Sequence, residues 1–561
     1  MKNALVARIL NEIADLLDLQ GVAFKPRAYR RAAEVVSALG EPIEGLVAQG
    51  THGDLPGVGD AIAKKIVEIV ETGRLEYHER LKTELPIDLH GLTSVEGIGP
   101  KTAKLLYDEL DIKNLDDLQI AARAGRIAAV KGLGAKTEAR ILQGLEEARR
   151  VEDRLRLGDA MPIAEDLIDR LRSLGRFERL QYAGSLRRGR ETIGDLDLLG
   201  IASDSQRAMA AFVGMSDVRE VLAHGETKSS VRLDGGLQVD LRIVVEESFG
   251  AALQYFTGSQ SHNIALRKRA VSRGWKLNEY GLYDEQGRAM AGPEETEIYD
   301  ALDLVVIPPE LREDLGEIQA AERRELPRLV EPSDIHADLH VHTDWSDGKA
   351  TIEQMVSEAK KRGLEAIAIT DHAHFAEVVR GLKPDDVRRQ IDAIARLNEV
   401  SEGIRVLSGI EVNVQPDGTL DMPDELLARL DVVIASIHSH FRQPRDEATA
   451  RWLRAIENPH VDILGHPSTR KIGIRAAMGV DWDVVFEAAA KRGVALEVNA
   501  NPIRLDLTGD LVRRAISLGC RIAVDTDAHH PDHYDFLRYG VLTARRGWAT
   551  REDVVNAGIV S

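Results

Sequence analysis

The apolar positions of the first 150 residues recur at the spacing of amphipathic helices. In the opening stretch, four apolar residues lie three or four positions apart and share one helix face: Ile9, Ile13, Leu16 and Leu17. Three later segments resemble one another, and each joins a glycine–apolar–glycine turn to an amphipathic helix: LPGVGDAIAKKI (55–66), VEGIGPKTAKLL (95–106) and VKGLGAKTEARI (130–141). The pattern predicts a helical N-terminal region with repeated turns.

From about residue 151 the pattern changes to short apolar runs that are typical of strands. The first such runs are LDLLGI (196–201), LQVDLRIVV (237–245) and LDLVVI (302–307). Residues 319–335 are charged and contain two prolines, which predicts a linker. After it, strands alternate with helices, and the strand runs are AIAIT (366–370), VVIAS (432–436), VDILGH (461–466), VALEVN (494–499) and RIAVDT (521–526). This alternation is typical of a parallel, barrel-like α/β domain.

Composition narrows the class of protein. The 561 residues suffice for three or four domains, and 43% hydrophobic with 29% charged residues argues against bulk disorder. The single cysteine, Cys520, excludes an internal disulfide framework and fits a reducing cytoplasm. The net charge of -19 argues against a nucleic-acid partner. The first 150 residues are almost neutral, however, so that argument applies to the rest of the chain.

The repeated glycine turns predict contacts with a nucleic-acid backbone. Glycine tolerates a positive φ and a close backbone approach, and amides at a helix N-terminus can hold a phosphate. The alternative is that the turns only pack a helical core. The segments resemble helix–hairpin–helix motifs, whose amides hold DNA phosphates, often with a monovalent cation such as K⁺ or Na⁺. The glycines assigned to DNA by this resemblance are Gly57, Gly59, Gly97 and Gly99.

Three aspartates on two predicted strands suggest a metal site. Asp195 and Asp197 are two positions apart, so both side chains point to the same face of one strand. Asp240 lies in a later strand, and if the strands are adjacent the three carboxylates converge. An apolar sheet does not gather three like charges without a cation, and oxygen ligands suit Mg²⁺ or Mn²⁺. Two such ions can assist phosphoryl transfer. The alternative is a solvated acidic strand end beside a basic turn.

The turn that precedes these aspartates lies in AGSLRRGRETIGDLDLL (183–199) and carries Arg187, Arg188 and Arg190. Turn and aspartates together resemble the family X DNA polymerases, the group that contains polymerase beta, over residues 1–318. The resemblance implies that Asp195 and Asp197 bind two metal ions. Asp240 would bind the catalytic one and help to activate the primer 3′-hydroxyl. The residues implied at the triphosphate are Gly184, Ser185, Arg188 and Gly194.

Two further segments match this family: YFTGSQSHNIALR (255–267) and GETK (225–228). Tyr255 and Phe256 would pack under the incoming sugar and exclude a 2′-hydroxyl, and Gly258 would give the nucleotide room. Asn263 would read the minor-groove edge of the incoming base. The residues implied at the DNA strands are Arg267 for the template and Lys228 for a primer phosphate.

The N-terminal residues resemble the small lyase domain of the same family. KPRAYRRAA (25–33) matches a stretch that binds the 5′-phosphate of a gap, through Lys25 and the region of Tyr29. Lys65 falls where the family has its Schiff-base lysine, which needs a lowered pKa to act as a nucleophile. Ala61 replaces the second nearby lysine, so the 5′-deoxyribose-phosphate lyase activity stays open.

A set of histidines and acids follows residue 336. His340 and His342 alternate on one predicted strand face, which suits a shared metal. Most of the remaining candidate ligands follow predicted strands, where barrels place their sites: Asp347, His372, Glu411, His438, His466, Asp527 and His529. The set resembles the PHP (polymerase and histidinol phosphatase) family, a distorted barrel with a trinuclear Mn²⁺ or Zn²⁺ cluster that hydrolyses phosphoesters. His374, His440 and His530 are expected as polar neighbours or at most as substrate contacts, and Arg470 as a phosphate contact.

The fold expected from these resemblances is multidomain: helical helix–hairpin–helix domains, an α+β nucleotidyltransferase palm and a C-terminal distorted (β/α)7 barrel. The expected divisions are a lyase-like domain (1–85), a helix–hairpin–helix subdomain (86–150), the palm (151–250), a nucleotide-selection subdomain (251–318), the linker (319–335) and the PHP barrel (336–561).

The expected function is a bacterial DNA-directed polymerase that fills short gaps in base excision repair. It would also have a Mn²⁺-dependent 3′–5′ exonuclease and an apurinic-site endonuclease activity. Partners would be gapped or primer–template DNA and dNTPs, without a membrane, and the protein would be a monomer. Two alternatives remain open: a template-independent nucleotidyltransferase fused to a small-molecule phosphatase, and a non-catalytic scaffold that binds DNA ends.

Overall fold

The computed structural model describes residues 3–558 except 21, 23–24, 39–42, 56–57, 89–91, 94, 96–97, 135, 143–144, 146–153, 176 and 375–380. The chain divides into two compact units. The first unit is Met1–Glu152 with the segments Thr343–Thr351 and His374–Leu382, and the second comprises Asp153–His342, Ile352–Ala373 and Lys383–Ser561.

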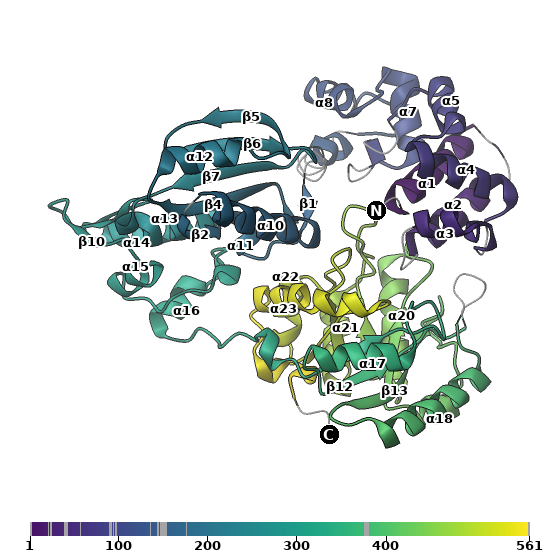
Figure 1. The fold of residues 1–561 in the computed structure, drawn as a ribbon. Helices are drawn as coiled ribbons and strands as arrows, with labels where there is room; N and C mark the ends of the chain where they lie inside the picture. The colour runs from purple at the N-terminus through teal and green to yellow at the C-terminus, as the bar shows by residue number, and fades with distance from the viewer. Residues whose placement is uncertain are drawn as a thin grey trace. The chain divides into compact units, whose positions relative to one another are not determined.

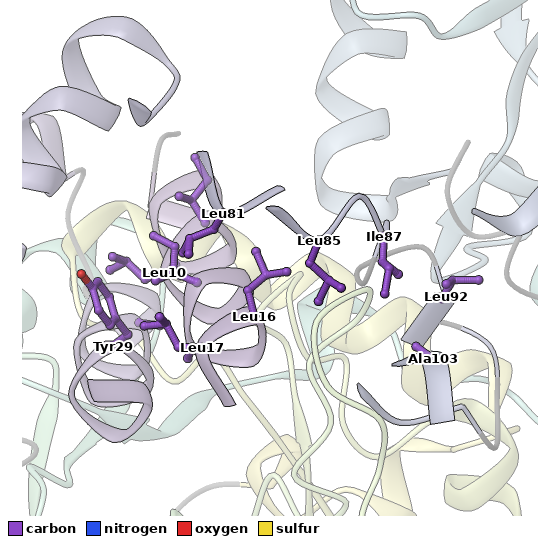
Figure 2. Close-up of a cluster of buried hydrophobic side chains, with 14 of the residues drawn as sticks. Leu10, Leu16, Leu17, Tyr29, Leu81, Leu85, Ile87, Leu92 and Ala103 are labelled. Carbon is purple, nitrogen blue, oxygen red and sulfur yellow. The ribbon is translucent and has the colours of Figure 1, made fainter. Parts of the chain in front are cut away.

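The N-terminal part of the first unit is helical, as its periodicity predicts. Its main helices are α1 (Asn3–Leu19), α2 (Lys25–Ala38), α3 (Ile43–Gln49), α4 (Asp60–Thr72), α5 (Glu76–Glu84), α7 (Pro100–Leu110) and α8 (Leu115–Arg123). Figure 2 shows Leu10, Leu16 and Leu17 of α1 among the side chains of this core, with Tyr29 of α2 and Leu81 of α5. The four apolar positions of the opening pattern are all buried.

Two of the repeated turns lead into α4 and α7, with Gly59 and Gly99 as the N-cap residues. Neither glycine uses the positive φ that glycine tolerates, because φ is -81° at Gly59 and -93° at Gly99. A Cβ at either position would meet no atom within 4 Å, so the approach to their backbone is open. Gly57 and Gly97 lie outside the described residues.

The second unit begins with a five-stranded sheet in the order β2-β4-β7-β6-β5. The strands are β2 (Phe177–Tyr182), β4 (Asp195–Ala202), β5 (Val218–His224), β6 (Lys228–Leu233) and β7 (Gln238–Ile243). Leu196 and Leu198 join the core formed with α10 (Leu157–Gly175) and α12 (Ser205–Val213). Leu199 faces the other way, against α13 (Phe249–Thr257). Helices therefore cover both faces of β4, the second strand of the sheet.

A smaller subdomain follows α13. It consists of α14 (Gln260–Ser272), α15 (Glu295–Ala301), α16 (Glu317–Arg323) and the sheet of β8 (Lys276–Asn278), β9 (Gly281–Tyr283) and β10 (Ala289–Ala291). The strand predicted for residues 302–307 is wrong, since these residues form a turn and extended coil. Leu302, Leu304 and Ile307 are instead buried in the core of this subdomain. The predicted linker 319–335 is also packed, because Leu329, Val330 and Ile335 are buried.

The C-terminal region forms a parallel sheet of seven strands in sequential order. The strands are β11 (Ala337–Val341), β12 (Ala366–Ile369), β13 (Arg405–Asn413), β14 (Val432–Ser436), β15 (Ile463–Gly465), β16 (Ala495–Asn499) and β17 (Ile522–Asp525). Helices around it include α17 (Ile352–Lys361), α18 (Pro384–Val400), α20 (Arg445–Glu457), α21 (Trp482–Arg492), α22 (Gly509–Ser517) and α23 (Leu537–Arg546) (Figure 1).

This sheet curls into a nearly closed barrel. The His342 amide donates to the carbonyl of Ala528 at 2.8 Å, and the Ala528 amide donates to the carbonyl of His340 at 3.2 Å. These bonds join the end of β11 to the segment that follows β17. The predicted (β/α)7 barrel is confirmed. In the described part of the chain, no helix has both the length and the hydrophobicity needed to cross a lipid bilayer.

Candidate active sites

The three aspartates of the first candidate site lie on neighbouring strands. In the parallel pairing of β4 with β7, Asp197 is directly opposite Asp240, and Asp195 is opposite Gln238. The predicted adjacency of the strands is thus confirmed. The Asp240 carboxylate accepts a hydrogen bond from Gln238 at 3.0 Å and pairs with the Lys228 ammonium at 3.2 Å. Burial, together with the charges of Asp195 and Asp240, raises the pKa of Asp197 to about 6.

This arrangement has the chemistry of a site for divalent cations. Three carboxylates lie on two adjacent inner strands, and their repulsion is relieved when a cation binds among them. They are less tightly gathered than the ligands in the barrel. Among the described residues, only barrel groups bring three or more ligand atoms within 4.8 Å of one another.

The turn before β4 fits closely around Asp197. Gly184 has a φ of +62°, and a Cβ on it would lie 2.6 Å from Oδ2 of Asp197. Only glycine is accommodated there. Ser185 follows in the short helix α11 (Gly184–Arg187) and is partly exposed. A Cβ on Gly194 would lie 2.9 Å from the guanidinium of Arg154, a residue that the sequence analysis did not name.

The arginines of this turn have different surroundings. Arg187 forms a bidentate ion pair with Glu295 at 2.8 and 3.0 Å. Arg188 donates to the carbonyl of Thr257 and, at 3.2 Å, to the carboxylate of Glu313. Arg190 is exposed and lies 3.6 Å from the same carboxylate. Arg187 therefore fixes the turn to α15, while Arg188 faces the residue before Gly258.

The residues predicted around the nucleotide sugar and base lie on α13 and α14. The rings of Tyr255 and Phe256 meet edge to face with centroids 5.1 Å apart. The Asn263 amide donates to the Tyr255 carbonyl at 2.7 Å and accepts from Gln254 at 2.8 Å. The Arg267 guanidinium lies 5.6 Å from the Tyr255 ring centroid. A Cβ on Gly258 would lie 3.1 Å from the guanidinium of Arg188, so this glycine keeps the two segments close.

In the helical unit, Tyr29 and Lys65 both lie beside Tyr77, a residue that was not predicted from the sequence. Tyr29 is buried and stacks on Tyr77 with centroids 6.4 Å apart, and its burial raises its pKa to about 12. The Lys65 ammonium lies 5.2 Å from the Tyr77 ring centroid and donates to the Ala61 carbonyl at 3.1 Å. Lys25 is exposed at the start of α2. Lys65 and Tyr29 thus flank one aromatic ring.

The barrel brings eight of the nine predicted ligands into three candidate metal-ligand groups. The three groups are His340, His342 and Asp527; His372, Glu411 and His438; and His342, Asp347, His372 and His529. His466 is in none of these groups but lies 3.1 Å from Oε1 of Glu411. The ligands come from the ends of β11, β12, β13, β14, β15 and β17, as the strand pattern predicts.

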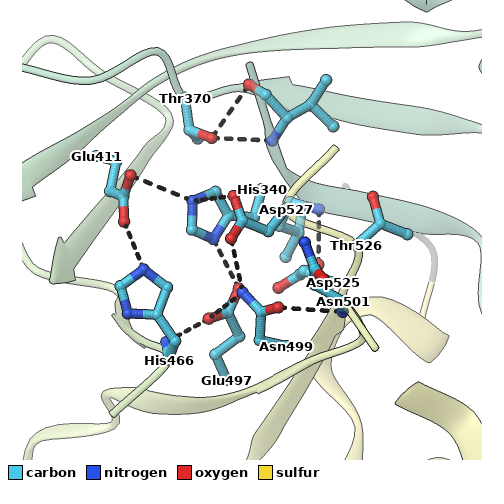
Figure 3. Close-up of polar contacts among 12 residues, drawn as sticks. His340, Thr370, Glu411, His466, Glu497, Asn499, Asn501, Asp525, Thr526 and Asp527 are labelled. Carbon is cyan, nitrogen blue, oxygen red and sulfur yellow. Dashed lines mark hydrogen bonds and ion pairs between the residues drawn. The ribbon is translucent and has the colours of Figure 1, made fainter. Parts of the chain in front are cut away.

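Glu411 lies at the centre of this cluster. Its Oε1 is 3.1 Å from His466 Nε2 and 3.3 Å from His438 Nε2, and its Oε2 is 2.7 Å from His372 Nδ1. Figure 3 shows Glu411 between His340 and His466. Both Glu411 oxygens and Nε2 of His340 are buried, and none of these close contacts has the geometry of a hydrogen bond. The surrounding histidines hold the pKa of Glu411 well below its usual range, despite its burial.

Buried orphan atoms that converge in this way fit a cluster of divalent metal ions. Burial lowers the pKa of both His342 and His466 to about 3, which keeps these imidazoles neutral. Neutral imidazoles and ionised carboxylates are the forms that bind a metal. The donor set of nitrogen and oxygen atoms suits Mn²⁺ or Zn²⁺.

A layer of residues behind the ligands holds them in place. Glu497 in β16 lies 2.6 Å from His340 Nδ1 through Oε1, and its Oε2 accepts from the His466 amide (Figure 3). Asn413 lies 2.6 Å from His438 Nδ1 through its Oδ1. Such partners fix the ring orientation of the ligand histidines. The signal for Glu497 was present in the sequence, because a lone acid stands in the apolar run VALEVN.

The arginine beside this cluster is Arg504, not Arg470. Arg470 makes a bidentate ion pair with Glu191 of the palm at 2.8 and 2.9 Å, so its predicted phosphate contact is not supported by its position. The Arg504 guanidinium lies 3.6 Å from Asp527 and is mostly buried. His440 is exposed, His530 is partly exposed, and both lie outside the three metal-ligand groups. Their role as polar neighbours of the cluster, or at most as substrate contacts, stays a prediction.

Four stretches of this chain match known protein domains. Residues 1–75 match a helix–hairpin–helix domain, 90–147 a SAM-like helix–hairpin–helix tandem, 252–313 the DNA polymerase beta thumb and 338–501 the PHP domain. The DNA polymerase/3′-5′ exonuclease PolX of Bacillus subtilis (strain 168) is 37% identical over 556 residues, which cover 98% of this chain and 97% of that protein.

Shorter matches cover the barrel. A probable phosphatase of Thermoanaerobacter sp. (strain X514) is 34% identical over 204 residues, 34% of this chain and 78% of its own length. A probable phosphatase of Caldanaerobacter subterraneus subsp. tengcongensis is 32% identical over 203 residues, 34% of this chain and 75% of its own length.

Proposed function

We propose roles for the candidate site residues of this chain, which belongs to the family X DNA polymerases that carry a PHP domain and has the Bacillus subtilis PolX as a relative. The protein is a DNA polymerase with a 3′–5′ exonuclease, which uses divalent metal ions and acts on DNA and dNTPs. The phosphatase alternative is disfavoured, because the probable phosphatases match only 34% of the chain.

Polymerisation is assigned to the palm, where Asp195, Asp197 and Asp240 would hold two Mg²⁺ or Mn²⁺ ions. The observation that carries this assignment is the direct pairing of Asp197 with Asp240 across β4 and β7. Bound ions would neutralise charge on the attacking and leaving oxygens. Lys228, which pairs with Asp240, would contact a primer phosphate.

The dNTP would lie between the turn before β4 and the start of α14. Gly184, Ser185 and Arg188 would hold the triphosphate, with Gly194 behind them. Tyr255 and Phe256 would lie under the sugar, where Gly258 keeps their segment close to Arg188. Asn263 would read the base only after its amide leaves the Tyr255 carbonyl. Arg267 would contact the template.

Exonucleolytic hydrolysis is assigned to the barrel, whose ligand set would hold up to three Mn²⁺ or Zn²⁺ ions. Such ions would polarise the scissile phosphate and supply the nucleophile. Glu497 and Asn413 orient the ligand histidines. Arg504, the cation beside Asp527, would bind a phosphate oxygen of the 3′ end. An apurinic-site endonuclease would use the same residues.

The cellular role is proposed to be short-gap filling in base excision repair, by a monomer associated with the bacterial nucleoid. The turns at Gly59 and Gly99 would bind DNA phosphates with K⁺ or Na⁺, as their open backbone allows. Lys25 would contact the 5′-phosphate of the gap. Lys65, beside Tyr77, would be the nucleophile of a 5′-deoxyribose-phosphate lyase.

One experiment tests the division into two sites. A gapped duplex labelled at the primer 5′ end is incubated with Mg²⁺ or Mn²⁺, with and without dNTPs. We expect Asp240→Asn to degrade the primer without extending it, and His340→Asn to extend it without degrading it. His530→Asn, a substitution at a partly exposed neighbour of the cluster, should do both. Loss of both activities in both site variants, with the control intact, would contradict two separate sites.

A further inference from the structure

The turn that precedes β4 is held from behind by the barrel. Gly189 in this turn has a φ of +61°, and a Cβ on it would lie 3.3 Å from Leu542 of α23. Glu191, at the end of the turn, forms the bidentate ion pair with Arg470. Leu505 and Tyr539 of the barrel region are buried in the same hydrophobic cluster as Leu196 of the palm. The barrel and the palm therefore share a packed interface at the back of the nucleotide site.

Arg546 of α23 makes the most direct contact across this interface. Its guanidinium donates to the main-chain carbonyl of Arg188 at 2.9 Å and to the Glu313 carboxylate at 3.2 Å. Glu313 in turn accepts from the Arg188 side chain. One barrel residue thus contacts both the backbone of Arg188 and the carboxylate that orients its guanidinium. Only 11% of the Arg546 side chain is exposed, so water competes weakly for these bonds.

We propose that Arg546, supported by Arg470, is a positioning residue for dNTP binding: the exonuclease barrel holds the palm turn in the shape that receives the triphosphate. This inference rests on the proposed role of Arg188 at the triphosphate. Neither arginine reaches the three palm carboxylates through any contact of the described residues. Their loss should therefore act on nucleotide binding rather than on the chemical step.

The test measures primer extension by the full-length protein as a function of dNTP concentration. We expect Arg546→Gln to raise the KM for dNTP by about 10-fold, the loss that follows when one charge-assisted hydrogen bond no longer orients a binding group. The kcat should stay within about two-fold, since the transition-state contacts are retained. Arg546→Lys keeps a donor for the Arg188 carbonyl and should recover part of the affinity.

Arg538→Gln is the matched control. Arg538 also joins the barrel to the palm, through an ion pair with Glu165 at 3.1 Å, but it does not contact the turn. If loosening the interface were sufficient, Arg538→Gln and Arg546→Gln would raise the KM alike, and that outcome would overturn the inference. Degradation of single-stranded DNA should be unchanged in both variants.

The variant Arg188→Gln tests the proposed triphosphate site separately from the positioning role of Arg546. If it leaves the KM for dNTP unchanged, the proposed triphosphate site is wrong. If it raises the KM while Arg546→Gln does not, the triphosphate site stands and the positioning role of the barrel is wrong. An increase in both variants, with the control unchanged, supports both.

Discussion

Glu497 offers a sharp test of how the barrel holds its metal ions. Both of its carboxylate oxygens are used: Oε1 lies 2.6 Å from His340 Nδ1, and Oε2 accepts from the His466 amide. An amide in place of the carboxylate has only one oxygen. In Glu497→Gln, one of the two buried donors must therefore face the NH₂ group. A conservative change of nearly equal volume thus removes an acceptor without opening a cavity.

The size of the effect follows from this unmet donor. A buried donor without an acceptor costs about 1–3 kcal/mol. This corresponds to an affinity for Mn²⁺ that is roughly 10- to 100-fold weaker, the range typical of residues that orient metal ligands. We expect exonuclease activity to fall in parallel at limiting Mn²⁺ and to recover partly at high Mn²⁺. Polymerase activity should be unchanged, because Glu497 has no contact with the palm carboxylates.

The assay is calorimetric titration of the metal-free protein with Mn²⁺, together with degradation of 5′-labelled single-stranded DNA. Glu365→Gln is the control, since it removes a surface contact of Glu365 with His336 at 3.2 Å and leaves the ligand cluster intact. If Glu497→Gln binds Mn²⁺ within two-fold of the wild type, the orienting role assigned to Glu497 is refuted.

Four further outcomes follow from single contacts. Gly184→Ala should reduce polymerisation by about 100-fold, because its Cβ would displace Asp197, while the exonuclease stays active; primer extension measures this. Arg504→Gln should raise the KM of the exonuclease for DNA by about 10-fold with Mn²⁺ binding unchanged, and an equal KM would exclude a phosphate contact. Lys65→Ala should abolish borohydride trapping of an abasic-site adduct, whereas Lys64→Ala should retain it. Arg312 and Arg187 lower the pKa of the buried Glu295 to about 2, so its ionisation stabilises the fold above pH 4.5 and this stability is lost as pH falls towards 2. Glu295→Gln should therefore lower the free energy of unfolding by about 3 kcal/mol at pH 7 and much less near pH 2, as denaturation at both pH values would show.

Residues that lie within short motifs could be predicted from the sequence. A strand has a two-residue period, so the D-x-D and H-x-H spacings place their side chains on one face wherever the strand lies. The pairing of Asp197 with Asp240 needed one further assumption, the adjacency of β4 and β7, which the structure confirms. The positions of the barrel ligands followed because parallel strands end at the same edge.

Features that depend on distant parts of the chain were missed or wrong. The apolar run 302–307 resembles a strand, but Leu302, Leu304 and Ile307 enter the subdomain core from a turn and coil. Arg470 follows a ligand in the sequence, yet it pairs with Glu191, 279 positions away. The layer behind the ligands was missed because Glu497 meets His340 only when β11 and β16 lie in one barrel. Local pattern determines which face a residue occupies, whereas its partner depends on the closed fold.

The net charge of -19 does not show how strongly the interface between palm and barrel repels DNA. The acids Glu165, Glu191, Glu310 and Glu313 precede the barrel, and each pairs with a barrel arginine. Much of the acidity there is thus neutralised within the protein and does not repel DNA. These pairs are partly buried, so salt screens them less than exposed contacts with DNA phosphates. Salt that releases DNA should therefore leave the palm and barrel joined, and with them the turn that receives the triphosphate.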